Sequence, residues 1–281
     1  MRYSVPLILV FALVACHRPT RTDDPTEFLR RHVETGLCGQ VFIEGDTTWT
    51  IEERMEHYGV HGVSIAVIDD FKIAWTKSYG VMDTMGRRPV TDSTLFQAAS
   101  ISKPVFTMAA LKLVEEGAIK LDEDVNTQLR SWKMPENEFT AKEKVTLKRL
   151  LGHVAGTTVH GFEGYLPGDP LPTLLNILNG EAPSNSPAVV VDQTPGTSWR
   201  YSGGGYCVAS QLILDAKGGT IPQHLHDLVL KPLGMSHSTY EQPLPGAMAD
   251  NAASGYIPDG SMTKGKWHVY PELSPDGLWT T

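Results

Sequence analysis

Strand-like patterning occurs at one place in this chain of 281 residues, between Gly62 and Gly80. Apolar residues alternate with smaller ones from Val63 to Val67, Asp69-Asp70 supplies a turn, and a second alternation begins at Ile73. These features predict a β-hairpin. A two-stranded hairpin is marginally stable by itself in water, so it must pack against helices or pair with further strands.

The rest of the chain has the pattern of helices and loops. The stretch Thr157–Arg200 is rich in Pro, Gly and Ser, and an irregular segment of that length usually forms a pocket wall or a lid. Apolar periodicity, caps and glycine stops predict the following helices: Trp49–Tyr58, Ser100–Gly117, Thr146–His153, Pro172–Asn179, Tyr206–Lys217 and Gln223–Leu230.

Composition excludes one function class. The formal net charge is −8 and no block of basic residues is present, so we expect no nucleic-acid partner. The hydrophobic fraction of 41% is ordinary for a globular protein.

The N-terminus predicts export. Arg2 is followed by VPLILVFALVA, which has the length of a signal-peptide core and is too short to span a bilayer. The run ends in Leu13-Val14-Ala15-Cys16, which resembles a bacterial lipobox and implies lipid attachment at Cys16; a simple secretory signal is the alternative. We therefore expect a signal peptide over residues 1–15 and a periplasmic protein of the bacterial cell envelope, held to the membrane by its N-terminal lipid.

The exported chain is expected to have two parts. Residues 16–48 form a lipid-anchored tether and lead-in, with residues 17–27 especially polar, and residues 49–281 form one domain. Export permits disulfides, but whether Cys38 and Cys207 pair does not follow from the sequence.

Ser100 and Lys103 begin the apolar helix that ends at Gly117, and residues three apart share a helix face. The first turn of a helix carries free N–H groups and partial positive charge, which favour an oxyanion. A lysine desolvated there can accept the serine proton. The competing interpretation is a serine N-cap with a solvated lysine.

Tyr201 lies in the glycine-rich turn PGTSWRYSGGGY, immediately before a helix. A tyrosine close to a lysine can act as a base, because the ammonium group stabilises the phenolate. A half-buried structural tyrosine is the alternative. His153, in LLGHVAG, is interpreted as a packing histidine at a helix end.

Four other patterns are rejected as sites. Ser261-Met262-Thr263-Lys264 repeats the serine–lysine spacing but lies in a turn-like loop with no apolar helix after it. Ser64 is inside a predicted strand and not at a strand-to-helix elbow. Gly260–Lys266 lacks the Ser or Thr that ends a phosphate-binding loop. His224 and His226 have no third ligand at a recognisable spacing, so no metal and no cofactor are predicted.

Taken together, four segments resemble a known family. In chain order they are SISKPVFTMAALKLVEEGAIKLDEDV, LLGHVAGT, PGTSWRYSGGGY and LKPLGMSHST. From about Val60 onward the chain is similar to the serine β-lactamase-related hydrolases, which include class C β-lactamases, class VIII-type esterases, D-aminopeptidases and penicillin-binding DD-peptidases.

The resemblance implies an α/β (α+β) fold, in which helices flank an antiparallel β-lactamase/transpeptidase-like sheet beside a mainly helical subdomain. It also implies roles. Ser100 is the acylated nucleophile, and its backbone N–H is one half of the oxyanion hole. Lys103 assists removal of the proton, and Tyr201 is the partner base.

The chain departs from the family pattern twice. The Y-x-N element reads Tyr201-Ser202-Gly203, and Gly203, at the substrate-binding position, has no amide for a substrate carbonyl. This change favours an esterase or an unusual peptidase. The third family element, K-x-G or H-x-G on a C-terminal strand, has no acceptable copy, and the final GLWTT resembles the start of a helix.

These departures predict a domain that is incomplete at its C-terminus. The strands that would pair with the hairpin are missing from the sequence pattern, so we expect this chain by itself to be poorly folded or inactive. The whole protein is expected to be a serine hydrolase that acts through an acyl-enzyme on an ester, a β-lactam or a D-amino-acid peptide. The alternative is a non-catalytic or sensor-type homologue that binds penicillin or peptidoglycan.

Overall fold

The computed structural model describes residues 25–41 and 43–281. The predicted signal peptide and Cys16 lie outside the described residues. Within the described part, no helix is long and apolar enough to cross a membrane.

The predicted hairpin is present. Strands β1 (Gly62–Asp69) and β2 (Lys72–Gly80) pair antiparallel, and they form a two-stranded sheet. The turn residues Asp70 and Phe71 have φ of 46° and 58°. Positive φ at both turn positions suits the right-handed twist of a two-residue hairpin turn.

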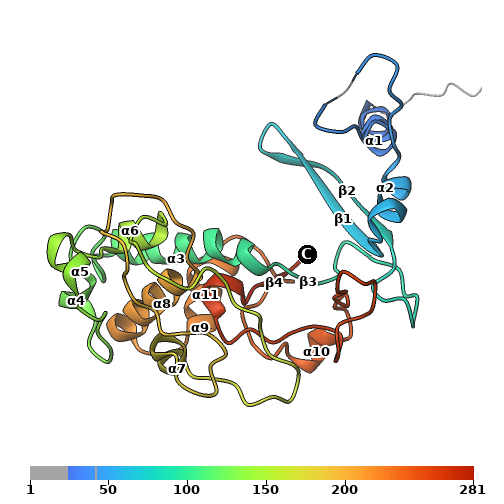
Figure 1. Cartoon of the computed structure of the whole chain (residues 1–281). Helices are drawn as coiled ribbons and strands as arrows, with labels where there is room; N and C mark the ends of the chain where they lie inside the picture. The colour runs from blue at the N-terminus through green and yellow to red at the C-terminus, as the bar shows by residue number, and fades with distance from the viewer. Residues whose placement is uncertain (1–24, 42) are drawn as a thin grey trace, which may run out of the picture.

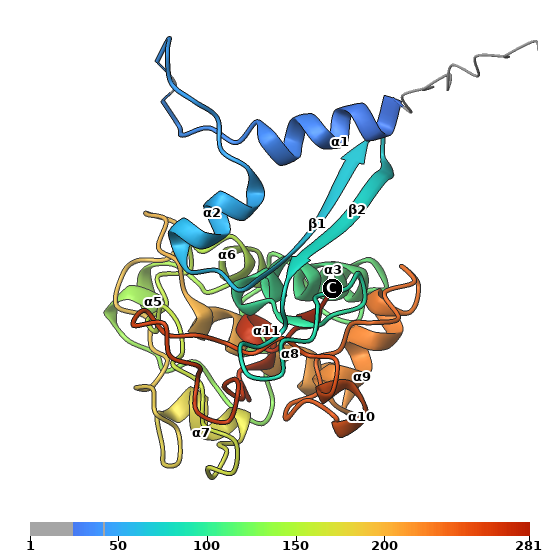
Figure 2. The ribbon, with the colours of Figure 1, turned by 90° about the vertical axis from the view of Figure 1, so that its right-hand side faces the viewer.

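The hairpin stands out from a helical body, and two N-terminal helices accompany it (Figures 1 and 2). Helix α2 (Ile51–Tyr58) is the predicted one, with a capping box between Thr50 and Glu53. Helix α1 (Pro25–Thr35) was not predicted, and it lies within residues 16–48, which were expected to form the tether and lead-in.

Helix α1 is fixed to the hairpin through Glu34. The Tyr79 hydroxyl donates a hydrogen bond of 2.8 Å to its carboxylate, which also forms an ion pair with Lys77 of β2. Burial, together with the bond to Glu34, raises the pKa of Tyr79 above its ordinary value. Within the described residues, α1 therefore pairs a charge with the hairpin, and the expected tether over the preceding residues stays a prediction.

Two long helices form the centre of the helical body. Helix α3 (Ser102–Glu115) buries one side through Phe106, Ala109 and Leu113, whereas α8 (Gly203–Lys217) is buried from Gly203 to Ile213. Smaller helices lie in the same body: α4 (Val125–Gln128), α5 (Glu138–Lys142), α6 (Leu147–Leu151), α7 (Leu174–Asn179) and α9 (Ile221–Leu225). Helix α10 (Gly246–Ala249) packs instead on a second apolar cluster that includes Leu244 and Trp279. The helix predictions near α3, α6, α7, α8 and α9 are confirmed in place, although the last continues as the π-helical turn η2 (His226–Leu230).

The final segment corrects one prediction. Trp279–Thr280 is strand β4, paired antiparallel with β3 (Phe96–Gln97), and not the start of a helix. The cause is tertiary packing, because the Trp279 side chain is completely buried in a cluster with Leu95, Leu244 and Ala252. This pairing places the preceding helix α11 (Leu273–Asp276) against α3 and α8.

The two described cysteines are unpaired. Cys38 is exposed, and Cys207 is buried in the centre of α8. Burial raises the pKa of the Cys207 thiol well above its usual value, so this thiol is a packing group.

Asp215, near the end of α8, holds the chain that follows α4. Its carboxylate accepts hydrogen bonds from the backbone N–H groups of Arg130 and Ser131, and from the side chains of Ser131 and Gln211. Asp215→Ala should lower the free energy of unfolding by about 1 to 2 kcal/mol, because backbone donors lose their acceptor. Urea unfolding measures this loss, and Asp215→Asn, which keeps one acceptor oxygen, should recover part of it.

Candidate active site

Ser100 lies in the 3₁₀ turn η1 (Ala99–Ile101), directly before α3, and its side chain is exposed. The sequence placed it in the first turn of α3; the structure places it one turn earlier, in continuous helical backbone. The preceding Ala99 has a φ of 43°, a left-handed conformation that is unusual for a residue with a Cβ. Such conformations gather at functional sites, where the surroundings hold them.

Lys103 is buried beneath the serine, with 4% of its surface exposed. Its Nζ donates a hydrogen bond of 3.0 Å to Ser100 Oγ and one of 3.1 Å to the Pro275 carbonyl oxygen. The predicted serine–lysine pair is therefore in hydrogen-bond contact, and the interpretation of Lys103 as a solvated lysine is wrong.

Tyr201 approaches the same lysine with its ring. Lys103 Nζ lies 4.7 Å from the centroid of the Tyr201 ring, within the range of a cation–π contact. The Tyr201 hydroxyl makes no hydrogen bond with any described residue. The structure thus brings Tyr201 to the site, but not with its oxygen on Ser100.

His153 orients this tyrosine, a role that the sequence did not indicate. The two rings stack with centroids 4.4 Å apart, and the Ser202 N–H donates a 3.1 Å hydrogen bond to His153 Nδ1. Burial, then the charges of Lys103 and His160, lower the pKa of His153, so the imidazole is neutral. The signal available in the sequence was only a histidine at a helix end, which is common in packing.

The surroundings of Gly203 explain why this position carries no side chain. A Cβ at this position would lie 2.9 Å from Phe162 Cε2 and 3.3 Å from the His160 carbonyl oxygen. An asparagine side chain would therefore displace the Phe162 ring. Part of the irregular stretch Thr157–Arg200 thus forms the wall beside Tyr201 and Gly203, and that wall is aromatic.

Two acidic residues that sequence reasoning missed lie in and directly before α11, and one of them contacts Ser100. Asp276 in α11 is 7% exposed; its Oδ1 accepts a 3.3 Å hydrogen bond from Ser100 Oγ and lies 3.7 Å from Lys103 Nζ. Glu272 is fully buried, and neither of its carboxylate oxygens has a hydrogen-bond partner. No motif marks Asp276, because it reaches the serine only through the packing of α11 against α3 and the pairing of β4 with β3.

The rejected patterns have ordinary surroundings. Ser261 is exposed and bonds to Asp259 of its own loop, far in sequence from any long helix. Ser64 is inside β1. His224 Nε2 bonds to the Gly218 carbonyl oxygen, and His226 pairs with Asp227.

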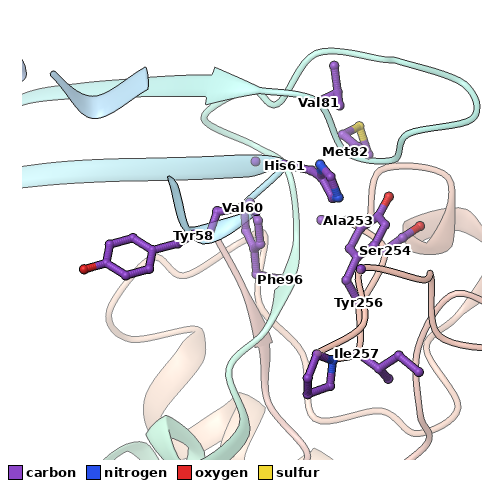
Figure 3. A pocket seen from close by; sticks show the side chains of 14 residues that line it. Tyr58, Val60, His61, Val81, Met82, Phe96, Ala253, Ser254, Tyr256 and Ile257 are labelled. Atoms are coloured by element: carbon purple, nitrogen blue, oxygen red, sulfur yellow. The ribbon is translucent and has the colours of Figure 1, made fainter. Parts of the chain in front are cut away.

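A cavity of about 490 Å³ lies at the foot of the hairpin (Figure 3). Its wall includes Tyr58, His61, Tyr256 and Ile257, and the His61 and Tyr256 rings meet edge to face at 4.3 Å. Ser100, Lys103 and Tyr201 do not line it, so this cavity is separate from the serine–lysine pair.

Comparison with known proteins decides the family. The family model described as Beta-lactamase matches residues 49–274. The chain belongs to the β-lactamase family. The family resemblance and the fold class predicted from the sequence are confirmed.

The β-lactamase-family relatives are distant in sequence. Protein flp of Staphylococcus aureus is 27% identical over 195 residues, which cover 68% of this chain and 37% of the relative. Unguisins hydrolase ungD of Aspergillus violaceofuscus is 27% identical over 257 residues, or 84% of this chain and 42% of the relative. This chain therefore spans less than half the length of these two relatives.

A solved class C β-lactamase superimposes with a TM-score of 0.66 at 22% identity, over 92% of this chain and 63% of that structure. At this identity the similarity establishes the fold alone. It places the helical body and the hairpin in a β-lactamase-like arrangement, and the chemistry must be argued from the side chains.

Proposed function

We propose that the protein is a serine hydrolase that acts through an acyl-enzyme formed on Ser100. The contact that carries the proposal is the 3.0 Å hydrogen bond between Lys103 Nζ and Ser100 Oγ, which joins an exposed hydroxyl to a buried ammonium group. An ammonium ion at that distance lowers the cost of forming an alkoxide. The membership of the β-lactamase family and the similarity to a protein named as a hydrolase support the same reaction class.

In the proposed reaction Ser100 Oγ attacks a substrate carbonyl, and the leaving group departs as the tetrahedral intermediate collapses. Water then releases the acyl group. Lys103 assists loss of the hydroxyl proton, and Tyr201, oriented by His153, is the second assisting group. The Ser100 backbone N–H is proposed as one donor to the oxyanion.

The substrate is proposed to be an ester in preference to an amide. Gly203 lacks an amide side chain, and Phe162 fills the space beside it, so this wall offers apolar contact instead of hydrogen bonds to a peptide or β-lactam carboxamide. A substrate carboxamide buried against this wall would have no hydrogen-bond partner there, and an unpaired buried polar group weakens binding.

The test is intact-mass spectrometry of the full-length protein after reaction with a fluorophosphonate, with a penicillin and with a p-nitrophenyl ester. We expect a fluorophosphonate adduct that peptide mapping places on Ser100. Ester release should turn over many times, and the penicillin adduct should form slowly or not at all.

Two serine variants give the controls. Ser100→Ala should remove the adduct, whereas Ser261→Ala, at the other serine–lysine spacing, should keep it. An adduct that persists in Ser100→Ala would refute the assignment. A stable penicillin adduct without turnover would indicate the sensor-type homologue instead of the hydrolase. Envelope location and lipid attachment at Cys16 stay predictions from the sequence.

A further inference from the structure

Asp276, in α11, contacts Ser100 Oγ, the reacting atom of the proposed site, although no sequence motif includes it. Its Oδ1 lies 3.3 Å from Ser100 Oγ, and the geometry has the hydroxyl donating to the carboxylate. A general base must lie within hydrogen-bond reach of the proton that it takes, and such bonds are often long before substrate binds. Asp276 meets this condition.

The hydrogen bonds of Lys103 favour a lysine that keeps its protons. Its Nζ has three neighbouring acceptors: Ser100 Oγ at 3.0 Å, the Pro275 carbonyl oxygen at 3.1 Å and Asp276 Oδ1 at 3.7 Å. An ammonium group has three donors and no acceptor, which matches this set. A neutral amine has two N–H donors, so its lone pair would face one of these three oxygens.

We propose that Asp276 accepts the proton of Ser100 during acylation, an inference that rests on Ser100 being the nucleophile proposed above. As the bond from Oγ to the substrate carbonyl carbon forms, the hydroxyl proton passes to the Asp276 carboxylate, and the carbonyl π electrons move to its oxygen. When the carbonyl re-forms, the bond to the leaving alkoxide breaks, and Asp276 returns the proton to that alkoxide. Lys103 remains an ammonium ion throughout and stabilises the charge on Oγ.

The surroundings of Asp276 make its carboxylate more basic than an exposed one. Burial raises the pKa of Asp276, while Lys103 and the Ser100 hydroxyl act against that rise. The other titratable groups around it are Glu272 and Tyr270 on its own segment and Cys207 on α8. All three are neutral or anionic and none is a cation, so Lys103 is the cationic partner from the facing helices.

The experiment follows the rate of fluorophosphonate labelling of the full-length protein between pH 4 and 9. Labelling of the unchanged protein should fall at acidic pH, because only the carboxylate form of Asp276 accepts a proton. The Asp276→Asn variant should be labelled about 100-fold more slowly, and its labelling rate should no longer decrease at acidic pH. Asp276→Glu should recover part of the rate and shift the midpoint of the fall.

The matched control is Asp259→Asn, which replaces an exposed carboxylate in a surface loop. This variant should be labelled at the same rate as the unchanged protein. If Asp276→Asn labels at an unchanged rate with the same acidic fall, Asp276 is not the acceptor, although the hydrolase proposal stands. No labelling of the unchanged protein at any pH would overturn both. If Asp276→Asn does not unfold cooperatively, Asp276→Glu decides, because an unmoved midpoint contradicts the proposal.

Discussion

Replacing Lys103 by methionine is expected to lower the rate of Ser100 acylation about 1000-fold. Methionine has a similar length and no branch, so it fits the buried position of Lys103, which is 4% exposed. It removes the ammonium group 3.0 Å from Oγ, and with it the charge that stabilises the forming alkoxide. Fluorophosphonate labelling and ester hydrolysis of the full-length protein both measure this loss.

The matched control is Lys112→Met on the same helix. Lys112 is exposed and pairs with Glu115 on the surface of α3, so its replacement should leave acylation unchanged. Thermal unfolding must accompany both variants, because removing a buried cation also leaves Asp276 without its partner. A folded Lys103→Met protein that acylates within tenfold of the unchanged rate would contradict the assignment of Lys103.

The helix-borne part of the site was predictable because its spacing is local. Ser100 and Lys103 are three residues apart in continuous helical backbone, and the apolar residues that follow them form the buried face of α3. Such an arrangement is carried by neighbouring residues and survives as a sequence pattern. The hairpin was predictable for the same reason, since its alternation and its turn lie within one short stretch.

The parts that were missed depend on contacts between distant segments. Asp276 reaches Ser100 because Trp279 is buried and pairs with Gln97. The carboxylate is therefore positioned by strand β4, a segment for which the sequence predicted a helix. His153 becomes an orienting group only when Tyr201 stacks on it. Neither role leaves a periodic signal, because each arises from packing across many intervening residues.

Replacing Glu272 by glutamine is expected to stabilise the protein at pH 8.5 by about 3 kcal/mol. Burial, with Asp276 adding to it, raises the pKa of Glu272 from 4.5 to about 7, and both carboxylate oxygens lack partners. The folded state therefore binds this proton more tightly than the unfolded state. As pH rises from 4.5 to about 7 the unfolded chain releases the proton first, so the free energy of unfolding falls across that window.

The glutamine removes this dependence because it carries no charge at any pH. Urea unfolding at pH 4.5 and at pH 8.5 should show little difference between Glu272→Gln and the unchanged protein at the lower pH, and the full gain at the higher. Glu241→Gln, at an exposed carboxylate, should show no gain at either pH. A gain of equal size at both values would mean that packing, and not the buried charge, explains the effect. A gain confined to the higher pH would show that the fold tolerates Glu272 at a cost in stability, beside the carboxylate that contacts Ser100.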